Sequence, residues 1–383
     1  MTPVKNFILI LFISCNSIAQ TAPFYESYNW ETTPSYQIEG LDNDMVAIKD
    51  KVVTEFYFED QNLTEYYLEH KILWLNSDDR IEEYNKIYLP FSNNATLQVS
   101  KARVIKKTGE VIELDESKIL SAENEESGRK YKYFALEGIE KESIIEYYYV
   151  VKRRPKYQGA RVDIQNNYNK QSVEFDLYAP ANLLFTFKSF NLDSTVTKDE
   201  ASSEKMHWQL AVKDVVGVDK EEQSPYRAAL GFVMYKLHQN TYNNSIITSY
   251  NEVAQNLFGF YYPVYNEEET KLIHKFAKNI KIEEGESEEN KARIVDLYIK
   301  ENIYISENDS ENLKKLTNVL DTKTANETGI VKLYVALFKK FNITHEMVLT
   351  SNRLKLKFDK EFEATNFLQE FLFYFPASKK YLS

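Results

Sequence analysis

The spacing of apolar residues changes once along this chain, near residue 245, and that change limits the folds open to it. Before it, β-branched and aromatic residues alternate with polar ones in runs such as "VVTEFYFE" (52–59) and "SIIEYYYVV" (143–151). A period of two is typical of strands with one buried face. After it, apolar residues recur every three or four positions, as in "EEETKLIHKFAKNI" (267–280), which is typical of amphipathic helices. The sequence predicts an α+β protein with a β-rich first half and a helical second half.

Further strand-length runs in the first half are separated by turn signals. These runs are "YYLEHKILWL" (66–75), "ARVIKKTGEVIEL" (102–114), "SVEFDLYAP" (172–180), "LLFTFKSF" (183–190) and "KMHWQLAV" (205–212). In the second of them, Gly109 can adopt the positive φ of a tight turn between two strands. Because no helical pattern intervenes, we expect antiparallel sheets packed face to face over residues 45–240.

The second half contains helical patterns with polar caps. Ser249 and Ser287 stand just before two of these patterns, where a hydroxyl can accept a bond from the first helical turn. A further helix lies within "TANETGIVKLYVALFKKFNITHEMVL" (324–349), and one face of it is predicted to carry Ile330, Leu333, Tyr334, Leu337, Phe338 and Phe341. Asn342 can take the left-handed conformation that ends a helix. β-rich runs follow at 344–353 and 368–376.

A secretory leader is predicted at the N-terminus. Lys5 precedes the apolar run "FILILFISC", and the small residue Ala19 follows, as in a signal peptide cleaved near residue 20. The alternative is a lipoprotein acylated at Cys15; it is less favoured because Phe12 stands where leucine is usual. No other stretch approaches the length of a membrane-spanning helix. We therefore expect a periplasmic or secreted protein.

The composition excludes two classes of function. Lys and Arg total 47 against 58 Asp and Glu, a net charge of −11. Nucleic-acid binding draws its affinity from a basic surface, so this acidity argues against such a partner. The only cysteine, Cys15, lies in the leader, and a mature chain without thiols has neither cysteine catalysis nor disulfides.

We expect no metal and no cofactor. The five histidines do not form a zinc-binding motif such as HExxH, since they are scattered over the chain as His70, His207, His238, His274 and His345. The stretch "SENDSEN" (306–312) is rich in oxygen ligands but lacks the glycine and glutamate spacing of a calcium loop. The sequence contains no phosphate-binding loop, dinucleotide fingerprint or GxSxG nucleophile motif.

Two segments of the first half resemble a known family. "ARVIKKTGEVIELDESKI" and "KYFALEGIEKESIIEYYYVVKRR" are similar to the recurring core of the domain of unknown function 3857. The resemblance covers residues 45–240, with Glu142 where the family often has glycine. It implies an all-β domain without a known activity. In exported bacterial proteins this domain typically precedes a transglutaminase-like domain.

The second half resembles that transglutaminase-like fold, a relative of the papain-like cysteine proteases. "KARIVDLYIKENIYI" and "LYVALFKKFNITHEMVL" match two of its elements, with Lys339 at the usual arginine and Asn342 at the usual glycine. Counted along these elements, the resemblance places Glu327 at the catalytic cysteine, Glu370 at the histidine and Ser383 at the aspartate. All three catalytic positions therefore differ from the family.

The resemblance implies a scaffold that has lost its reaction. In the family, a helix N-terminus lowers the pKa of the cysteine, a histidine moves its proton, and a third residue orients the histidine. Glu327 at such a helix end gains about 0.3–1 kcal/mol of stability, but a carboxylate is a poor nucleophile for acyl transfer. Glu370 cannot replace an imidazole. The alternative is that Glu327 and Glu370 form an acid–base pair of carboxylates with separated pKa values.

The predicted organisation has four parts: a signal peptide (1–20), an N-terminal segment (21–44), an all-β domain (45–240) and a degenerate transglutaminase-like domain (241–383). The chain stops at "KKYLS", where relatives continue into another strand, so it is either short or a fragment. We expect a non-catalytic exported protein that binds a protein or polymer of the cell envelope. The alternative function is a carboxylate-based hydrolase that uses Glu327 and Glu370.

Overall fold

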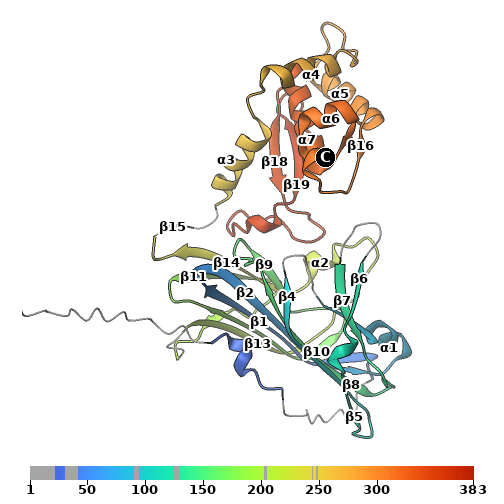
Figure 1. The fold of residues 1–383 in the computed structure, drawn as a ribbon, viewed down its shortest axis with the longest axis vertical. Coiled ribbons are helices and arrows are strands. Elements are labelled where there is room, and N and C mark those ends of the chain that lie inside the picture. The colour runs from blue at the N-terminus through green and yellow to red at the C-terminus, as the bar shows by residue number, and fades with distance from the viewer. Residues whose placement is uncertain are drawn as a thin grey trace, which may run out of the picture.

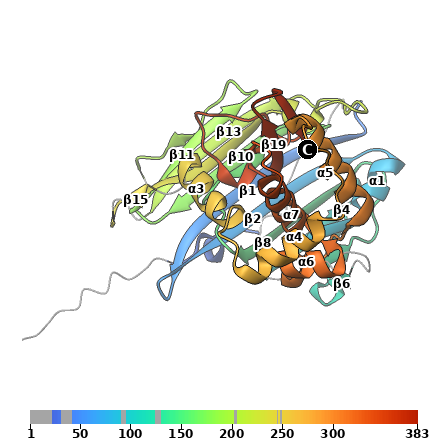
Figure 2. The ribbon, with the colours of Figure 1, turned by 90° about the horizontal axis from the view of Figure 1, so that it is seen from above.

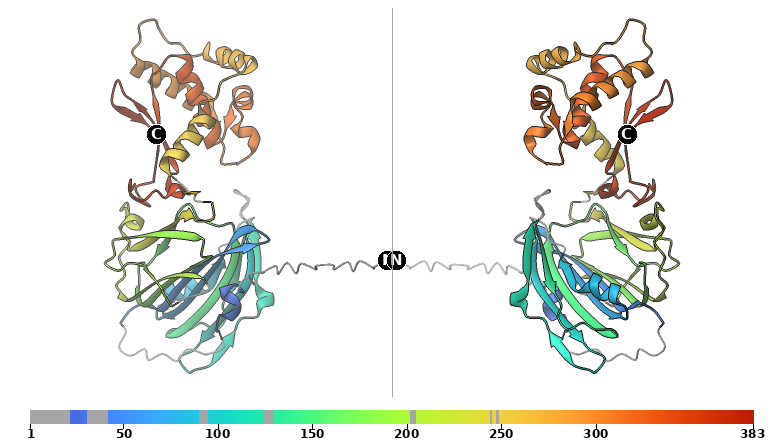
Figure 3. Two further views of the ribbon diagram at one scale, coloured as in Figure 1. Left: turned by 90° about the vertical axis from the view of Figure 1, so that its left-hand side faces the viewer. Right: turned by 90° about the vertical axis from the view of Figure 1, so that its right-hand side faces the viewer.

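The computed structural model describes residues 22–30, 42–89, 95–123, 130–201, 205–243, 245–246 and 249–383. The predicted leader, with Cys15, lies outside these ranges. The described chain forms two lobes stacked along the long axis, one of strands and one mainly of helices (Figures 1 and 3). Among the described residues, no helix is both long and apolar enough to cross a membrane. The predicted α+β class, β-rich first and more helical afterwards, is confirmed.

An eight-stranded sheet is the centre of the first lobe, in the order β12-β13-β10-β1-β2-β8-β4-β5. Its strands are β1 (Met45–Glu59), β2 (Asn62–Leu75), β4 (Thr96–Ile105), β5 (Val111–Glu113), β8 (Ser143–Arg153), β10 (Asn169–Ala179), β12 (Thr197–Lys198) and β13 (Met206–Val215). The expectation of purely antiparallel sheets is wrong in one pairing, because β1 and β10 run parallel. A long connection separates these two strands in sequence, which allows the chain to cross over and return in the same direction.

Two small sheets cover one face of the large sheet. One has the order β3-β7-β6, from Lys86–Leu89, Lys130–Ala135 and Leu120–Glu123. The other joins β11 (Leu183–Phe190), β14 (Phe232–Asn240) and β15 (Ser245–Ile246), with β9 (Ala160–Asp163) also paired to β14. Each small sheet has its own apolar core against the large sheet, so the first lobe is a sandwich with a divided second layer.

Residues 22–30 lie on the opposite, outer face of the large sheet. They include the short 3-10 helix η1 (Phe24–Ser27), and their aromatic side chains pack against Val53, Leu68 and Tyr148. Two short helices in this half were not predicted: α1 (Asp78–Tyr84), which Ser77 caps, and α2 (Tyr226–Ala229). Both are too short to show a helical period in the sequence.

The second lobe packs five helices and a small sheet around α7. The helices are α3 (Tyr250–Tyr261), α4 (Glu267–Ala277), α5 (Glu288–Asn302), α6 (Leu316–Thr322) and α7 (Glu327–Lys340). The sheet has the order β18-β19-β20, from Glu346–Thr350, Glu370–Phe375 and Lys380–Leu382. A short parallel pair, β16 (Tyr304–Ile305) and β17 (Thr324–Ala325), precedes α7.

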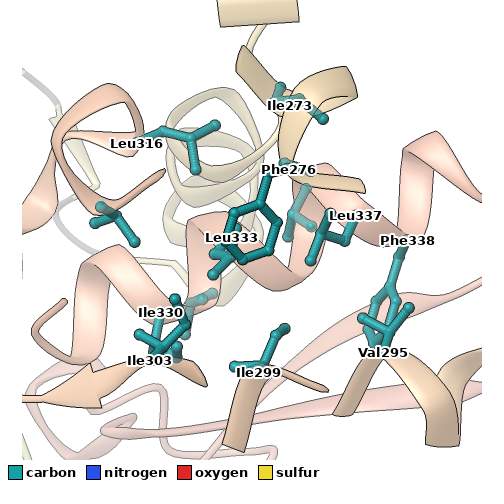
Figure 4. Packing of buried hydrophobic residues seen from close by; sticks show 14 of the residues in the cluster. Ile273, Phe276, Val295, Ile299, Ile303, Leu316, Ile330, Leu333, Leu337 and Phe338 are labelled. Atoms are coloured by element: carbon teal, nitrogen blue, oxygen red, sulfur yellow. The ribbon is translucent and has the colours of Figure 1, made fainter. Parts of the chain in front are cut away.

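Local signals in the sequence correctly placed several ends of these helices. The Ser249 hydroxyl accepts from the Glu252 amide at 3.1 Å, and the Ser287 hydroxyl accepts from the Asn290 amide at 3.2 Å. Asn342 has a φ of 53°, the left-handed conformation predicted for it. The predicted apolar residues of α7 do belong to the core, with Ile330, Leu333, Leu337 and Phe338 buried; Val331, Val335 and Ala336, outside that list, are buried as well. The helix is the centre of the core, surrounded by other elements (Figure 4).

The segment 351–369, between β18 and β19, joins the two lobes. Leu356, Phe362 and Ala364 form an apolar cluster with Phe232 and Met234 of β14. Polar contacts surround it: Lys188 pairs with Asp359, Arg161 donates to the Lys355 carbonyl at 2.8 Å, and Asn366 donates to the Gly159 carbonyl at 2.9 Å. Seen along the long axis, the helices lie over the strands of the first lobe (Figure 2).

Candidate functional site

The N-terminus of α7 is held by a buried cap. Asn326 is only 5% exposed, and its side-chain oxygen accepts from the Gly329 amide at 3.0 Å. The backbone N–H of Asn326 donates to the carbonyl oxygen of Leu313, with an N···O distance of 3.4 Å. Leu313 belongs to the 3-10 helix η3 (Glu311–Lys314). A Cβ on Gly329 would lie 2.0 Å from this same carbonyl oxygen, so glycine is required there. Backbone of η3 thus packs directly against the first turn of α7.

Glu327, predicted at the position of the nucleophile, is the first residue of α7 and is exposed. A carboxylate there faces the positive end of the helix dipole. The next residue, Thr328, lies near the hydroxyl of Tyr261, a buried residue of α3. Burial raises the pKa of Tyr261, and the contact with Thr328 partly offsets this rise. The helix end therefore presents a carboxylate beside a phenol.

Glu370 and Ser383 lie on adjacent strands of the small sheet. Glu370 begins β19, and its Oε1 accepts from the Asn352 amide nitrogen at 2.9 Å. Ser383 follows β20; Leu382 is opposite Phe373 in the middle of β19, and the antiparallel pairing directs the chain after it toward the start of β19. Both predicted positions thus fall at the same end of one strand pair. The side chain of Glu370 is already engaged by a residue of the linking segment.

Helix α7 packs on the sheet β18-β19-β20. The ring of Phe338 lies 5.2 Å from that of Phe373 and 5.5 Å from that of Phe375, and Tyr334 lies 5.7 Å from Phe373. Tyr334 also donates to Asp296 of α5 at 2.7 Å. Residues 328–341 therefore lie against the 344–376 sheet, with α7 between the sheet and the other helices.

A groove runs between α3 and β18, which is the terminal strand of its sheet among the described residues. It has a volume of about 420 Å³ and is lined mainly by apolar and aromatic side chains. These include Leu257, Phe258, Tyr262, Met347, Leu349 and Phe358. Phe258 is 62% exposed and stacks on Tyr262 with ring centroids 4.8 Å apart. This groove was not predicted from the sequence; the apolar outer residues of α3 were the available signal.

His345 lies at one wall of this groove among aromatic rings. Its Nδ1 lies 2.8 Å from the Ile343 carbonyl oxygen, an acceptor, so Nδ1 carries the proton. Burial lowers the pKa of the imidazole; the Ile343 carbonyl opposes this shift, and Lys339 adds to it. Burial also raises the pKa of Tyr262 to about 12. The groove is therefore lined by neutral side chains at neutral pH, apart from Glu346 at its rim.

His207, on β13, has a structural role. It lies 2.7 Å from Asp176 and 3.0 Å from Asp199, and its ring stacks on Tyr178. Within the described part of the chain, no group of three or more His, Cys, Asp or Glu could hold a metal ion.

Comparison with known proteins supports the resemblance stated for the first half. Residues 61–216 match the family described as "Domain of Unknown Function with solved-structure structure (DUF3857)". This segment is similar to that family. It contains the strands from β2 to β13, including the small sheet β3-β7-β6, whereas β1, β14 and the whole second lobe lie outside the match. No curated protein matches the chain.

A solved structure resembles the chain over both lobes. It is the crystal structure of a "putative protease" from Parabacteroides distasonis ATCC 8503, with a TM-score of 0.68 and 12% sequence identity. The match covers 89% of this chain and 67% of the other. At this identity the likeness concerns the fold.

Proposed function

We propose that this protein is an exported, non-catalytic binding protein whose second lobe has a transglutaminase-like arrangement without the residues for acyl transfer. The observation that carries the proposal is the N-terminus of α7. A capped helix end packed beside a small sheet is the place where that family holds its cysteine, and here it presents Glu327. The only cysteine of the chain, Cys15, belongs to the predicted leader.

Acyl transfer also needs a proton acceptor and a residue that orients it. The corresponding positions carry Glu370 and Ser383, and Glu370 accepts a hydrogen bond from Asn352. Neither residue supplies an imidazole. The helix and the sheet are thus retained for packing, with 23 buried apolar residues in one continuous core around α7.

We assign the binding role to the groove between α3 and β18, and its ligand to an extended apolar segment of a partner polypeptide. A terminal strand offers unpaired backbone groups to an added strand, and adjacent apolar pockets select its side chains. Phe258 and Met347 face this groove. Its volume of about 420 Å³ suits a few side chains.

The test is binding of fluorescent extended peptides, from a library with alternating apolar residues, to the full mature chain. We expect a set of peptides that bind the wild type and lose about tenfold or more of their affinity in Phe258→Ser. Val264→Ser is the matched control, because Val264 is 97% exposed and does not line the groove. Equal affinities in the two variants, or no peptide binding at all, would reject the groove as the binding site.

The alternative function is a hydrolase that uses Glu327 and Glu370 as acid and base. We place it second because the Glu370 carboxylate is bound to Asn352. Export is the remaining part of the proposal and rests on residues 1–20. Sequencing the N-terminus of the protein from an envelope fraction tests it: a start near residue 20 is expected, and a retained Met1 would contradict export.

A further inference from the structure

A stripe of polar residues crosses the inner face of the large sheet. Strand β1 contributes Asp50 and Thr54, and the neighbouring β2 contributes Tyr67, Glu69 and Lys71, which pair with β1 across the ladder. The same face is apolar on both sides of the stripe. Met45, Ala47, Leu73 and Leu75 pack under the sheet β3-β7-β6, and Phe56 packs under β9 and β14. The stripe therefore lies in the gap between the two small sheets.

Most charges of the stripe are paired. Lys170 lies 2.6 Å from Asp50, Lys71 lies 3.1 Å from Glu69, and Tyr67 donates to Glu69 at 3.0 Å. Buried ion pairs of this kind are often no more stabilising than apolar residues of similar volume. Stability alone therefore does not account for a polar band between two apolar cores.

A cavity of about 580 Å³ lies over the stripe. Residues 160–163 of β9 and Tyr235 of β14 line its walls. Asn366, Phe367 and Gln369 of the linking segment line it as well, so both lobes contribute. This volume is in the usual range for small-molecule sites, about 300–1,000 Å³, and far exceeds that of an inorganic ion.

The lining is positively charged although the protein is acidic. Its cationic residues are Lys71, Arg153, Lys156, Arg161 and Arg227. Its carboxylates are Asp50, Glu69 and Asp163. Five against three leaves an excess of two positive charges, in a chain whose net charge is −11. A concave surface with an excess of one charge favours ligands of the opposite charge.

Two of these cations are available to a ligand. Arg153 is held by Glu65, and Arg161 by Asp163 and two backbone carbonyls. Lys156 has no ion pair or hydrogen bond from its ammonium within the described chain. The side chain of Arg227 is 58% exposed, and its ion pair with Asp163 is long, at 3.8 Å. Burial and the charge of Arg153 lower the pKa of Lys156, more than Glu65 restores it. Lys156 as a residue is exposed, so a ligand can reach this ammonium.

We propose that this cavity binds a small organic carboxylate, with Lys156 and Arg227 receiving the carboxylate and the walls around Tyr67 and Tyr235 enclosing the rest of the molecule. An arginine fork and a lysine ammonium both form charge-assisted hydrogen bonds with a carboxylate. The aromatic walls and the volume favour a ligand with an organic body. This site is separate from the groove between α3 and β18, and the two share no lining residue.

The experiment is calorimetric titration of the full mature chain with three probes. These are acetyl-trialanine as the free acid, its C-terminal amide, and inorganic phosphate. We expect the free acid to bind, at least tenfold more tightly than the amide or phosphate, and its affinity to fall as salt is raised. Lys156→Met, which keeps the aliphatic stem, and Arg227→Gln should each weaken the free acid about tenfold.

Lys220→Met is the control, since Lys220 is an exposed lysine outside the cavity. Unchanged thermal unfolding of each variant shows that the fold is intact. The proposal is overturned if the amide or phosphate binds as well as the free acid, or if Lys156→Met behaves like Lys220→Met. It is also overturned if none of the probes binds at about 10 mM, since weaker binding is not a specific site.

Discussion

The Leu313 carbonyl oxygen and Gly329 are in such close contact that a Cβ on the glycine would lie 2.0 Å from that oxygen. This contact closes η3 over the first turn of α7 and sets the position of Glu327. A side chain at position 329 can be accommodated only if η3 or α7 moves, because the clashing atom belongs to the backbone.

Gly329→Ala is therefore expected to destabilise the protein by about 1–3 kcal/mol, the usual cost of overpacking a core. The measurement is the free energy of unfolding in urea. Gly259→Ala is the matched control: Gly259 is also in a helix, α3, and a Cβ added to it would meet no atom within 4 Å. That variant should gain about 0.5–1 kcal/mol from helix propensity. If Gly329→Ala unfolds with the same free energy as the wild type, η3 can shift to make room for the Cβ at little cost.

The side chain of Asn326 caps the N-terminus of α7. Asn326→Ala removes the acceptor for the Gly329 amide and should cost about 0.5–2 kcal/mol. Asn326→Asp keeps an acceptor at the same position and should cost less. Ser249→Ala, at the exposed cap of α3, provides the reference for a cap outside the core. If Asn326→Ala and Asn326→Asp unfold alike, the side-chain bond to Gly329 contributes nothing measurable.

A buried network under residues 22–30 predicts a loss of stability in acid. His70 Nδ1 accepts from the Tyr28 hydroxyl at 2.7 Å, and its Nε2 lies 3.0 Å from Glu146, which Arg103 also contacts at 2.8 Å. Burial lowers the pKa of His70, and Glu146 reverses only part of the shift. The unfolded chain, with a histidine pKa of about 6.5, thus binds the proton first.

The contribution of His70 to stability is accordingly complete above about pH 6.5 and is lost as the pH falls through its lowered folded pKa. Unfolding free energies between pH 7.5 and 5 should decrease more in the wild type than in His70→Gln, since glutamine does not titrate. His345→Gln is the necessary comparison, because the pKa of His345 is also lowered. Identical pH profiles for wild type and His70→Gln would disprove the role of His70.

The carboxylates of Glu327 and Glu370 allow a test of the hydrolase alternative. For a non-catalytic protein, Glu327→Gln changes stability by about 0.3–1 kcal/mol through the helix dipole and changes no turnover. The assay is hydrolysis of amide and ester substrates by the purified protein without thiols. Turnover that is lost in both Glu327→Gln and Glu370→Gln, but kept in Glu346→Gln, would establish the hydrolase instead.

The contact between the lobes depends on a few apolar residues of the segment 351–369. Phe362 is 7% exposed and packs against β14, so Phe362→Ala should cost about 3–5 kcal/mol of local packing. We expect calorimetric unfolding to separate into two transitions and proteases to cleave within 351–369. Phe358→Ala, at a residue that is 45% exposed, is the control. A single unchanged transition would mean that other contacts hold the lobes together.

Much of the secondary structure could be predicted because its causes are local. Alternation in 52–59 and 183–190 marked strands, since successive side chains on a strand point to opposite faces. Ser249, Ser287 and Asn342 marked helix ends because the groups that they satisfy lie within four residues of them. These features belong to the sequence alone.

Tertiary structure decided the rest, because it depends on contacts between residues far apart in the chain. Nothing near β1 or β10 indicates that these strands pair in parallel, and nothing near Val335 indicates that other elements cover it. The sequence shows Gly329 only as a glycine within a helix. Glycine is required there because the Leu313 carbonyl oxygen leaves no room for a Cβ. The cavity over the polar stripe likewise forms only where β2, β9 and the segment 351–369 meet. The excess of positive charge in its lining arises because the fold brings these cationic residues together, whereas the sequence as a whole is acidic.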